Sequence, residues 1–209
     1  MKKILCILLA AVMMALPLVS CGSGDDLPKI TDFTNVAKTE TQTNYVRFEV
    51  ENFGHFTIEL YPNTAPITVE NFKKLVSEGF YDGLRFHRVV ADFVIQTGDP
   101  NGDGTGGSKE NIKGEFSSNG VRNNLAHEHG VVSMARRSND NNSASSQFFV
   151  CLSDNSNVQN LDGDYAAFGM VVDGLSVVDE IGKVKVNSNN DAPLVKVVIK
   201  SAYFIEEAK

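Results

Sequence analysis

Apolar and polar residues alternate in two neighbouring stretches near the first quarter of the chain. Residues 45–51 place a valine or phenylalanine at every second position between charged residues, and residues 56–60 repeat the alternation with Phe, Ile and Leu. A period of two residues predicts a β-strand with one buried face. The turn Asn52-Phe53-Gly54 separates the stretches, and two such runs across a glycine-containing turn predict a β-hairpin.

After the hairpin the hydrophobic pattern changes to a helical period. Apolar residues recur every three or four positions from Val69 to Val76. We predict a helix that is capped by Thr64, has Pro66 in its first turn and ends at Gly79. A second, shorter apolar pattern predicts a helix around Leu175–Ile181.

Further apolar runs between turn residues predict six more strands. These runs are Leu84–Val90, Phe93–Thr97, Val131–Met134, Gln147–Leu152, Ala167–Val172 and Leu194–Ile205. Eight short strands with two helices and long polar loops are typical of an antiparallel barrel. We therefore predict a mainly β fold, a closed eight-stranded antiparallel barrel capped by two α-helices.

The first 20 residues have the pattern of a secretory signal. A basic start, Met1-Lys2-Lys3, precedes thirteen consecutive apolar residues from Ile4 to Leu16, and Pro17 follows them. A helix that spans a bilayer needs about 20 apolar residues. The shorter run behind a basic start indicates a cleaved signal peptide, and we assign residues 1–20 to it.

The segment after the signal indicates a lipid anchor. Leu18-Val19-Ser20-Cys21 resembles a bacterial lipobox, whose cysteine receives a diacylglycerol before the chain is cut on its N-terminal side. Cys21 would then be the lipidated first residue. Residues 21–44 are rich in Gly, Ser, Asp, Thr and Asn without a period, which predicts a flexible tether. We expect an exported protein, lipid-anchored to a bacterial membrane and facing the periplasm or the cell surface.

Composition and charge exclude several classes of protein. Apolar residues make up 42% of the chain, which excludes disorder over most of its length. The formal net charge is −7, and loss of Lys2 and Lys3 with the signal would take it to −9. Nucleic-acid phosphates need a surface rich in Lys and Arg, so we expect no nucleic-acid partner. Residues 45–205 are predicted to form a single domain.

The three cysteines have different expected fates. Cys6 leaves with the signal and Cys21 is acylated, so the mature domain keeps only Cys151 and has no internal disulfide. Cys151 ends the apolar run 147–151, which predicts a buried and unreactive thiol.

A glycine-rich loop satisfies two motifs whose context argues against both. Gly102–Gly107 fits G-x-G-x-x-G, but no βαβ unit surrounds it. Asp99–Glu110 fits the EF-hand pattern at every specified position, yet an EF-hand needs a helix on each side, and a predicted strand precedes this loop. His127 and His129 lack a third ligand at an evident spacing. We expect no metal; a calcium-dependent structural module stays as a minor alternative.

A long motif and five shorter ones carry a family resemblance. The long motif is Phe86-His87-Arg88-Val89-Val90-Ala91-Asp92-Phe93-Val94-Ile95-Gln96-Thr97-Gly98-Asp99. The shorter ones follow in order: Gly104-Thr105-Gly106-Gly107, Ser133-Met134-Ala135, Ser145-Ser146-Gln147-Phe148-Phe149, Leu161-Asp162-Gly163 and Phe168-Gly169. Together they resemble the cyclophilin-type peptidyl-prolyl isomerases, from about Tyr45 to Ile205. The loop that fits the EF-hand pattern is itself part of this family pattern.

The resemblance implies a fold and a site. The family's barrel has a packed interior and two capping helices, and its active site is a groove on the outside. By resemblance, Arg88 is the catalytic residue. The substrate-binding residues that match are Phe93, Val94, Gln96, Ala135, Phe149 and Leu161, with Tyr165 added as a packing residue for the proline ring. Neither a metal nor a cofactor is implied, and we expect a monomer.

The chain departs from many eukaryotic relatives at two positions. Asn160 stands where those relatives have a Trp that is associated with tight cyclosporin binding, so we expect weak inhibition by cyclosporin. Tyr165 stands where they have His. The chain beside the groove is also longer, with Arg136 and Arg137 at the start of the extra stretch.

The resemblance and the export signal together predict a function. We expect a peptidyl-prolyl cis-trans isomerase that assists the folding of exported proline-containing polypeptides, unfolded or partly folded, by non-covalent stabilisation of the twisted X-Pro amide. The alternative is a chaperone-like module that binds proline-containing segments with little turnover.

Overall fold

The computed structural model describes residues 36–206. Its strands are β1 (Tyr45–Val50), β2 (Gly54–Leu60), β3 (Arg88–Val90), β4 (Val94–Thr97), β5 (Val131–Met134), β6 (Phe148–Cys151), β7 (Ala167–Asp173) and β8 (Ile199–Phe204). Its helices are α1 (Pro66–Ser77), α2 (Ser156–Gln159), α3 (Leu175–Gly182) and the 3₁₀ turn η1 (Ser117–Asn119). All eight predicted strands and both predicted helices are present, whereas the sequence pattern does not predict α2 or η1.

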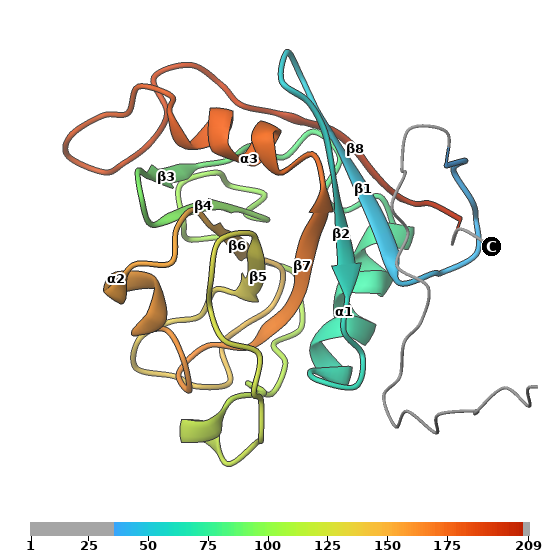
Figure 1. The fold of residues 1–209 in the computed structure, drawn as a ribbon, viewed down its shortest axis with the longest axis vertical. Helices are drawn as coiled ribbons and strands as arrows, with labels where there is room; N and C mark the ends of the chain where they lie inside the picture. Colours follow the sequence, from blue (N-terminus) through green and yellow to red (C-terminus); the bar gives the residue numbers. More distant parts are fainter. Residues whose placement is uncertain (1–35, 207–209) are drawn as a thin grey trace, which may run out of the picture. The chain divides into compact units, whose positions relative to one another are not determined.

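The eight strands form one antiparallel sheet in the order β3-β4-β6-β5-β7-β2-β1-β8. The sheet curls around its own axis, with α1 packed against β8 and α3 against β2 and β4 (Figure 1). The segments just before the two edge strands meet at an isolated bridge between Arg85 and Val198. Two backbone hydrogen bonds flank this bridge, from the Phe86 N–H to the Val197 carbonyl at 2.9 Å and from the Ile199 N–H to the Leu84 carbonyl at 2.8 Å. The predicted barrel is therefore closed by a short bridge at one joint and by full strand ladders elsewhere.

Aromatic side chains fill the interior of the barrel. Neighbouring ring centroids lie 5.0 to 6.2 Å apart in a group made of Phe48, Phe56, Phe72, Tyr81, Phe148 and Phe168. Contacts of this kind between fully buried rings stabilise the core by about 0.5–1.5 kcal/mol a pair beyond the burial of area. The interior is thus packed, and a ligand must bind elsewhere.

The alternation of side chains along β4 and β6 creates a second, smaller cluster. Ile95 and Phe148 point into the main core, so their neighbours Val94 and Phe149 point to the opposite face of the sheet. There they pack in a separate cluster with buried Cys151 and Val158. This outer cluster is the base on which the candidate site is built.

The cap of α1 differs from the prediction. The residue at the N-cap is Ala65, and its side chain makes no capping hydrogen bond. The carboxylate of buried Glu115 takes this role from a distant loop. It accepts hydrogen bonds from the backbone N–H groups of Ile67 and Thr68 at 3.1 and 2.8 Å and from the Thr68 hydroxyl at 2.7 Å. The prediction of Thr64 as the cap was wrong because the capping group comes from 47 residues away.

The last part of the predicted tether runs beside the end of β8. Lys38 and Ile205 form an antiparallel bridge, the Thr43 hydroxyl donates to the Ile205 carbonyl at 2.7 Å, and the Glu206 N–H donates to the Ala37 carbonyl at 2.9 Å. The signal peptide, Cys21 and the rest of the tether lie outside the described residues. Within residues 36–206, no helix is long and apolar enough to cross a bilayer.

Candidate active site

Strand register aligns three of the predicted site residues on the outer face of the sheet. Arg88 on β3 pairs with Gln96 on β4, and Gln96 pairs with Phe149 on β6. Residues that pair directly across antiparallel strands share a face and stand about 4.5–5.5 Å apart at their Cβ atoms. Because Phe149 belongs to the outer cluster, Arg88 and Gln96 also stand on the outside of the barrel.

A pocket of about 180 Å³ lies at this position. Its lining residues are Arg88, Phe93, Val94, Gln96, Ala135, Arg136, Phe149, Leu161 and Tyr165. The structure thus brings together all eight catalytic and substrate-binding residues expected from the resemblance, and it adds Arg136. Apolar side chains form the floor, and the two arginines and the amide stand at the rim.

Arg88 is held loosely, with its guanidinium free to donate further hydrogen bonds. Its Nη1 donates to the Gln96 Oε1 at 3.4 Å, and its Nε lies 3.5 Å from the Asp191 carboxylate. The Arg88 side chain is 37% exposed. A half-exposed arginine with two long contacts keeps most of its five N–H donors available to a ligand.

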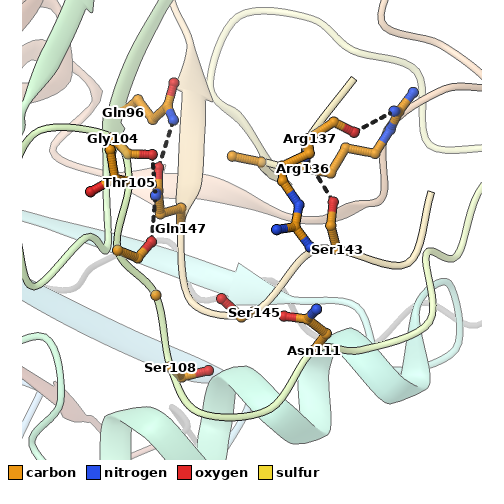
Figure 2. Close-up of a pocket in the computed structure, with 13 residues that line it drawn as sticks. Gln96, Gly104, Thr105, Ser108, Asn111, Arg136, Arg137, Ser143, Ser145 and Gln147 are labelled. Carbon is orange, nitrogen blue, oxygen red and sulfur yellow. Dashed lines mark hydrogen bonds between the residues drawn. The ribbon is translucent and has the colours of Figure 1, made fainter. Parts of the chain in front are cut away.

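Gln96 links Arg88 to the glycine-rich loop. Its Nε2 donates to the Gln147 Oε1 at 2.9 Å, and the Gln147 Nε2 donates to the carbonyls of Gly104 and Gly106 at 3.1 and 2.7 Å. A second pocket, lined by the glycine-rich loop, adjoins the first. Figure 2 shows this chain of amides on one side of the second pocket, with Arg136 and Arg137 on the other side. Each amide is fixed by its neighbour, so the Gln96 carbonyl oxygen is aimed at Arg88.

A buried histidine supports the Phe149 wall from behind. The His127 ring stacks on the Phe149 ring at 6.1 Å, with Nδ1 2.8 Å from the Asp162 carboxylate and Nε2 2.9 Å from the Ser133 hydroxyl. Burial lowers the pKa of His127, although Asp162 opposes this shift. The uncharged ring can donate from Nδ1 and accept at Nε2, which satisfies both contacts. The sequence shows His127 only as a metal-ligand candidate, a role that the structure gives to neither ring nitrogen.

Arg136 is the lining residue that the family motifs do not identify. Its guanidinium carbon lies 4.8 Å from the Tyr165 ring centroid and 5.3 Å from the Phe116 ring centroid. The Tyr165 ring in turn meets Phe149 edge to face at 5.8 Å. The Tyr165 ring is therefore in contact with the cation of Arg136 as well as with the ring of Phe149.

The loop that imitates an EF-hand uses its first carboxylate for its own backbone. Asp99 is 1% exposed, and it accepts hydrogen bonds from the N–H groups of Asn101, Asp103 and Gly104 at 2.8, 3.0 and 2.6 Å. Neither flank is a helix, since β4 precedes the loop and residues 111–116 after it are not helical. Within residues 36–206, no group of three or more His, Cys, Asp or Glu is arranged to hold a metal ion.

Cys151 is fully buried in the outer cluster. Burial raises the pKa of its thiol to about 12, and a thiol that stays protonated is a poor nucleophile. The prediction of a buried thiol is confirmed.

Comparison with known proteins identifies the family. A family model described as cyclophilin type peptidyl-prolyl cis-trans isomerase/CLD matches residues 45–204. The chain belongs to the cyclophilin family. A peptidyl-prolyl cis-trans isomerase-like 1 protein of Emericella nidulans is 40% identical over 156 residues, which are 74% of this chain and 91% of the relative. A Helicobacter pylori peptidyl-prolyl cis-trans isomerase is 44% identical over 132 residues, 62% of this chain and 76% of the relative.

A solved structure agrees with this membership. The cyclophilin-type isomerase of Cryptosporidium parvum, crystallised in the presence of the dipeptide Ala-Pro, has a TM-score of 0.69 and 28% sequence identity, covering 78% of this chain and 99% of its own. The cyclophilin fold and peptidyl-prolyl cis-trans isomerase activity predicted from the motifs are therefore confirmed. Cyclophilins bind proline-containing peptides, and the pocket described above has the size and apolar floor to hold a proline ring.

Proposed function

We propose that this cyclophilin acts, as a lipid-anchored monomer outside the cytoplasm, on exported proline-containing polypeptides that are still folding. The lipobox at Cys21 and the signal before it support the anchor. The observation that carries the site assignment is the alignment of Arg88 and Gln96 at the rim of an apolar, proline-sized pocket. We assign Arg88 as the catalytic residue and the other predicted lining residues as the binding surface.

The reaction sets the demands on the site. Rotation about a peptide bond has a barrier of about 18–20 kcal/mol because the planar amide is stabilised by resonance. An X-Pro bond exchanges its two isomers over tens to hundreds of seconds. Shortening that time to about a millisecond needs a factor of roughly 10⁴–10⁵, or about 5.5–7 kcal/mol. No bond is made or broken, so the reaction calls for no nucleophile.

Arg88 has the position and chemistry to stabilise the twisted amide. When the C–N bond rotates out of plane, the proline nitrogen regains a lone pair that is delocalised in the planar form. A guanidinium N–H can donate to that lone pair, and this hydrogen bond is stronger in the transition state than in the ground state. A hydrogen bond to a charged group contributes about 1.5–3 kcal/mol.

The pocket supplies the remaining stabilisation by holding the substrate. An apolar floor that includes Phe93 and Phe149 immobilises the proline ring, while the Gln96 amide is placed to bind the flanking backbone. Fixing both sides of the rotating bond removes unproductive orientations before the reaction. Arg suits the rim better than Lys, since its planar fork is permanently charged and preorganised.

The test is prolyl exchange on a short X-Pro peptide, followed by NMR exchange spectroscopy. We expect Arg88→Ala to lower kcat/KM by about 10- to 100-fold, the loss of one charge-assisted hydrogen bond of about 1.5–3 kcal/mol. Arg88→Lys should restore only part of the rate. Arg122→Ala, at an exposed position outside the pocket, is the matched control and should exchange the peptide like the unaltered protein.

Two results would contradict the proposal. An Arg88→Ala variant as fast as the unaltered protein would remove Arg88 from the mechanism. Peptide binding without faster exchange in the unaltered protein would favour a chaperone-like binding module in place of an isomerase.

A further inference from the structure

The groove extends beyond the proline pocket into two flanking pockets. One, of about 520 Å³, is bordered by Arg136, Arg137 and the glycine-rich loop; the other, of about 320 Å³, is bordered by Arg85 and Lys196. Gln96 lines all three pockets, Arg136 is shared with the larger flanking pocket, and Arg88 with the smaller one. The three hollows therefore adjoin one another, and an extended peptide with proline in the central pocket would reach both flanks.

Five basic side chains line this groove: Arg85, Arg88, Arg136, Arg137 and Lys196. Two of them have carboxylate partners, because Arg88 lies 3.5 Å from Asp191 and Arg137 lies 3.5 Å from Asp140. The ion pairs found within residues 36–206 include no partner for the other three.

The three remaining cations are distributed over both flanks. On the larger flank, the acceptors of Arg136 among the described residues are the backbone carbonyls of Asp164, Arg137 and Ser138. On the smaller flank, the acceptor of Arg85 in the same part of the chain is the Gly102 carbonyl. Neither guanidinium has a carboxylate within ion-pair distance among the described residues, although Asp103 lies close enough to Arg85 to interact with its charge.

Lys196 completes the smaller flank. It is exposed at the border of that pocket, and within the described residues its ammonium group belongs to no ion pair. It therefore presents an uncompensated charge directly to any peptide segment that enters there.

One carboxylate opposes the cations within the lining itself. Asp103 borders the smaller flanking pocket, where its Oδ1 accepts hydrogen bonds from the Thr105 N–H and hydroxyl at 2.9 and 2.6 Å. Buried Asp99 lies behind the same loop, since it accepts hydrogen bonds from the Asp103 and Gly104 N–H groups. With Asp99, Asp140 and Asp191 also counted, five cations face four carboxylates, so the groove keeps an excess of positive charge. The chain as a whole has the opposite sign, with 19 Lys and Arg against 26 Asp and Glu.

We propose that this groove selects proline-containing segments whose flanking residues are acidic. The proposal rests on the isomerase function proposed above and adds a substrate class to it. Opposite charges attract most where low-dielectric walls limit the solvent, and a hollow of one sign raises the local concentration of ligands of the other sign. The negative remainder of the surface repels acidic segments, so they are attracted to the groove and not to the rest of the molecule.

The experiment compares three matched peptides with the same X-Pro pair, in which the residues on both sides of that pair are all Glu, all Gln or all Lys. At low ionic strength, where the Debye length is about 30 Å, we expect kcat/KM for the Glu peptide to exceed that for the Lys peptide by about tenfold or more. In about 1 M salt, where the Debye length is about 3 Å, the preference should fall to about threefold or less.

Charge reversal at one flank locates the effect. Lys196→Glu should lower the ratio of kcat/KM for the Glu peptide to kcat/KM for the Gln peptide by about three- to tenfold. The matched control is Lys74→Glu, on an exposed position of α1 that lines none of the three pockets. It makes the same change in net charge, so an equal effect of both variants would assign the preference to net charge and overturn the role of the groove.

The outcomes separate this inference from the proposed function. Equal kcat/KM for the three peptides, with all of them exchanged, would overturn acidic selection and leave the isomerase function standing. Exchange of none would overturn the proposed function. In that case NMR titration of the Glu and Lys peptides still decides the selection, because equal dissociation constants would refute it without any turnover.

Discussion

Two buried histidines place an acid-sensitive element beside the groove. His87 is 7% exposed, and neither of its ring nitrogens has a hydrogen-bond partner among residues 36–206. Burial lowers its pKa from the ordinary value of 6.5, against the opposing charge of Asp99. Burial also lowers the pKa of His127 from the same value. Both rings are thus kept uncharged in the folded protein.

The pH dependence of folding follows from these directions. Below a pH of about 6.5 these two histidines bind protons in the unfolded chain but stay unprotonated in the folded protein. The free energy of unfolding therefore falls as the pH is lowered from 7 to 5. Each unit of pKa lowering corresponds to about 1.4 kcal/mol. Urea denaturation across this pH range should show the loss in the unaltered protein and a smaller loss in His87→Gln.

His55→Gln serves as the control for this measurement. His55 is 41% exposed and lies outside the core, so this variant should keep the acid loss of the unaltered protein. A His87→Gln variant whose stability falls with acid as steeply as that of the unaltered protein would contradict the role of the buried ring.

The sequence predicts site residues that occupy motifs and misses those placed by long-range packing. All eight expected catalytic and binding residues line one pocket, because their motifs fall on β3, β4, β6 and the adjoining loops at fixed register. Arg136 joins them through its contacts with the rings of Phe116 and Tyr165, 20 and 29 positions away. The residues that follow Arg136 are polar loop residues that give no sign of this contact.

At the scale of elements, α1 depends on a carboxylate that is remote in sequence. Glu115 is 2% exposed and satisfies three donors at the start of the helix. Glu115→Gln keeps the size of the side chain but removes its charge and turns an amide N–H₂ toward N–H donors. We expect the free energy of unfolding, measured in urea, to fall by about 1–3 kcal/mol.

Thr64→Ala is the control for the cap. Thr64 is the cap that the sequence pattern predicts, but Ala65 is the N-cap residue and no capping hydrogen bond comes from this position. The variant should therefore change stability by no more than about 0.5 kcal/mol. If Thr64→Ala lowered the free energy of unfolding more than Glu115→Gln does, Thr64 and not Glu115 would be the residue that caps α1.

Strands were easier to predict here than helix ends and joints. A period of two residues identifies β1 and β2, and short apolar runs between turn residues identify the other six, so all eight strands are located from local pattern alone. Helix α2 is a single turn with one buried residue, Val158, and one apolar position defines no period. The closure at Arg85 and Val198 joins segments 113 positions apart, which alternation within either segment does not reveal.

At the scale of the whole molecule, the lipid anchor stays a prediction that mass spectrometry can test. Because Leu18-Val19-Ser20-Cys21 resembles a lipobox, we expect the mature protein expressed in a bacterial host to begin at Cys21 with an acylated N-terminus. Several acyl chains, at about 0.8 kcal/mol per buried methylene, would hold the protein firmly to a membrane. Cys21→Ser should release the protein from the membrane fraction. An unmodified Cys21 thiol in the membrane-associated protein would contradict lipidation.

The pairing of residues 37–43 with the end of β8 makes the domain suitable for circular permutation. The Glu206 N–H donates a hydrogen bond of 2.9 Å to the Ala37 carbonyl, so the two ends of the described part of the chain are neighbours in space. A linker of a few residues could fuse them without crossing the barrel. A circular permutant opened in an exposed loop would begin at a different strand but would keep every pair of neighbouring strands in the sheet.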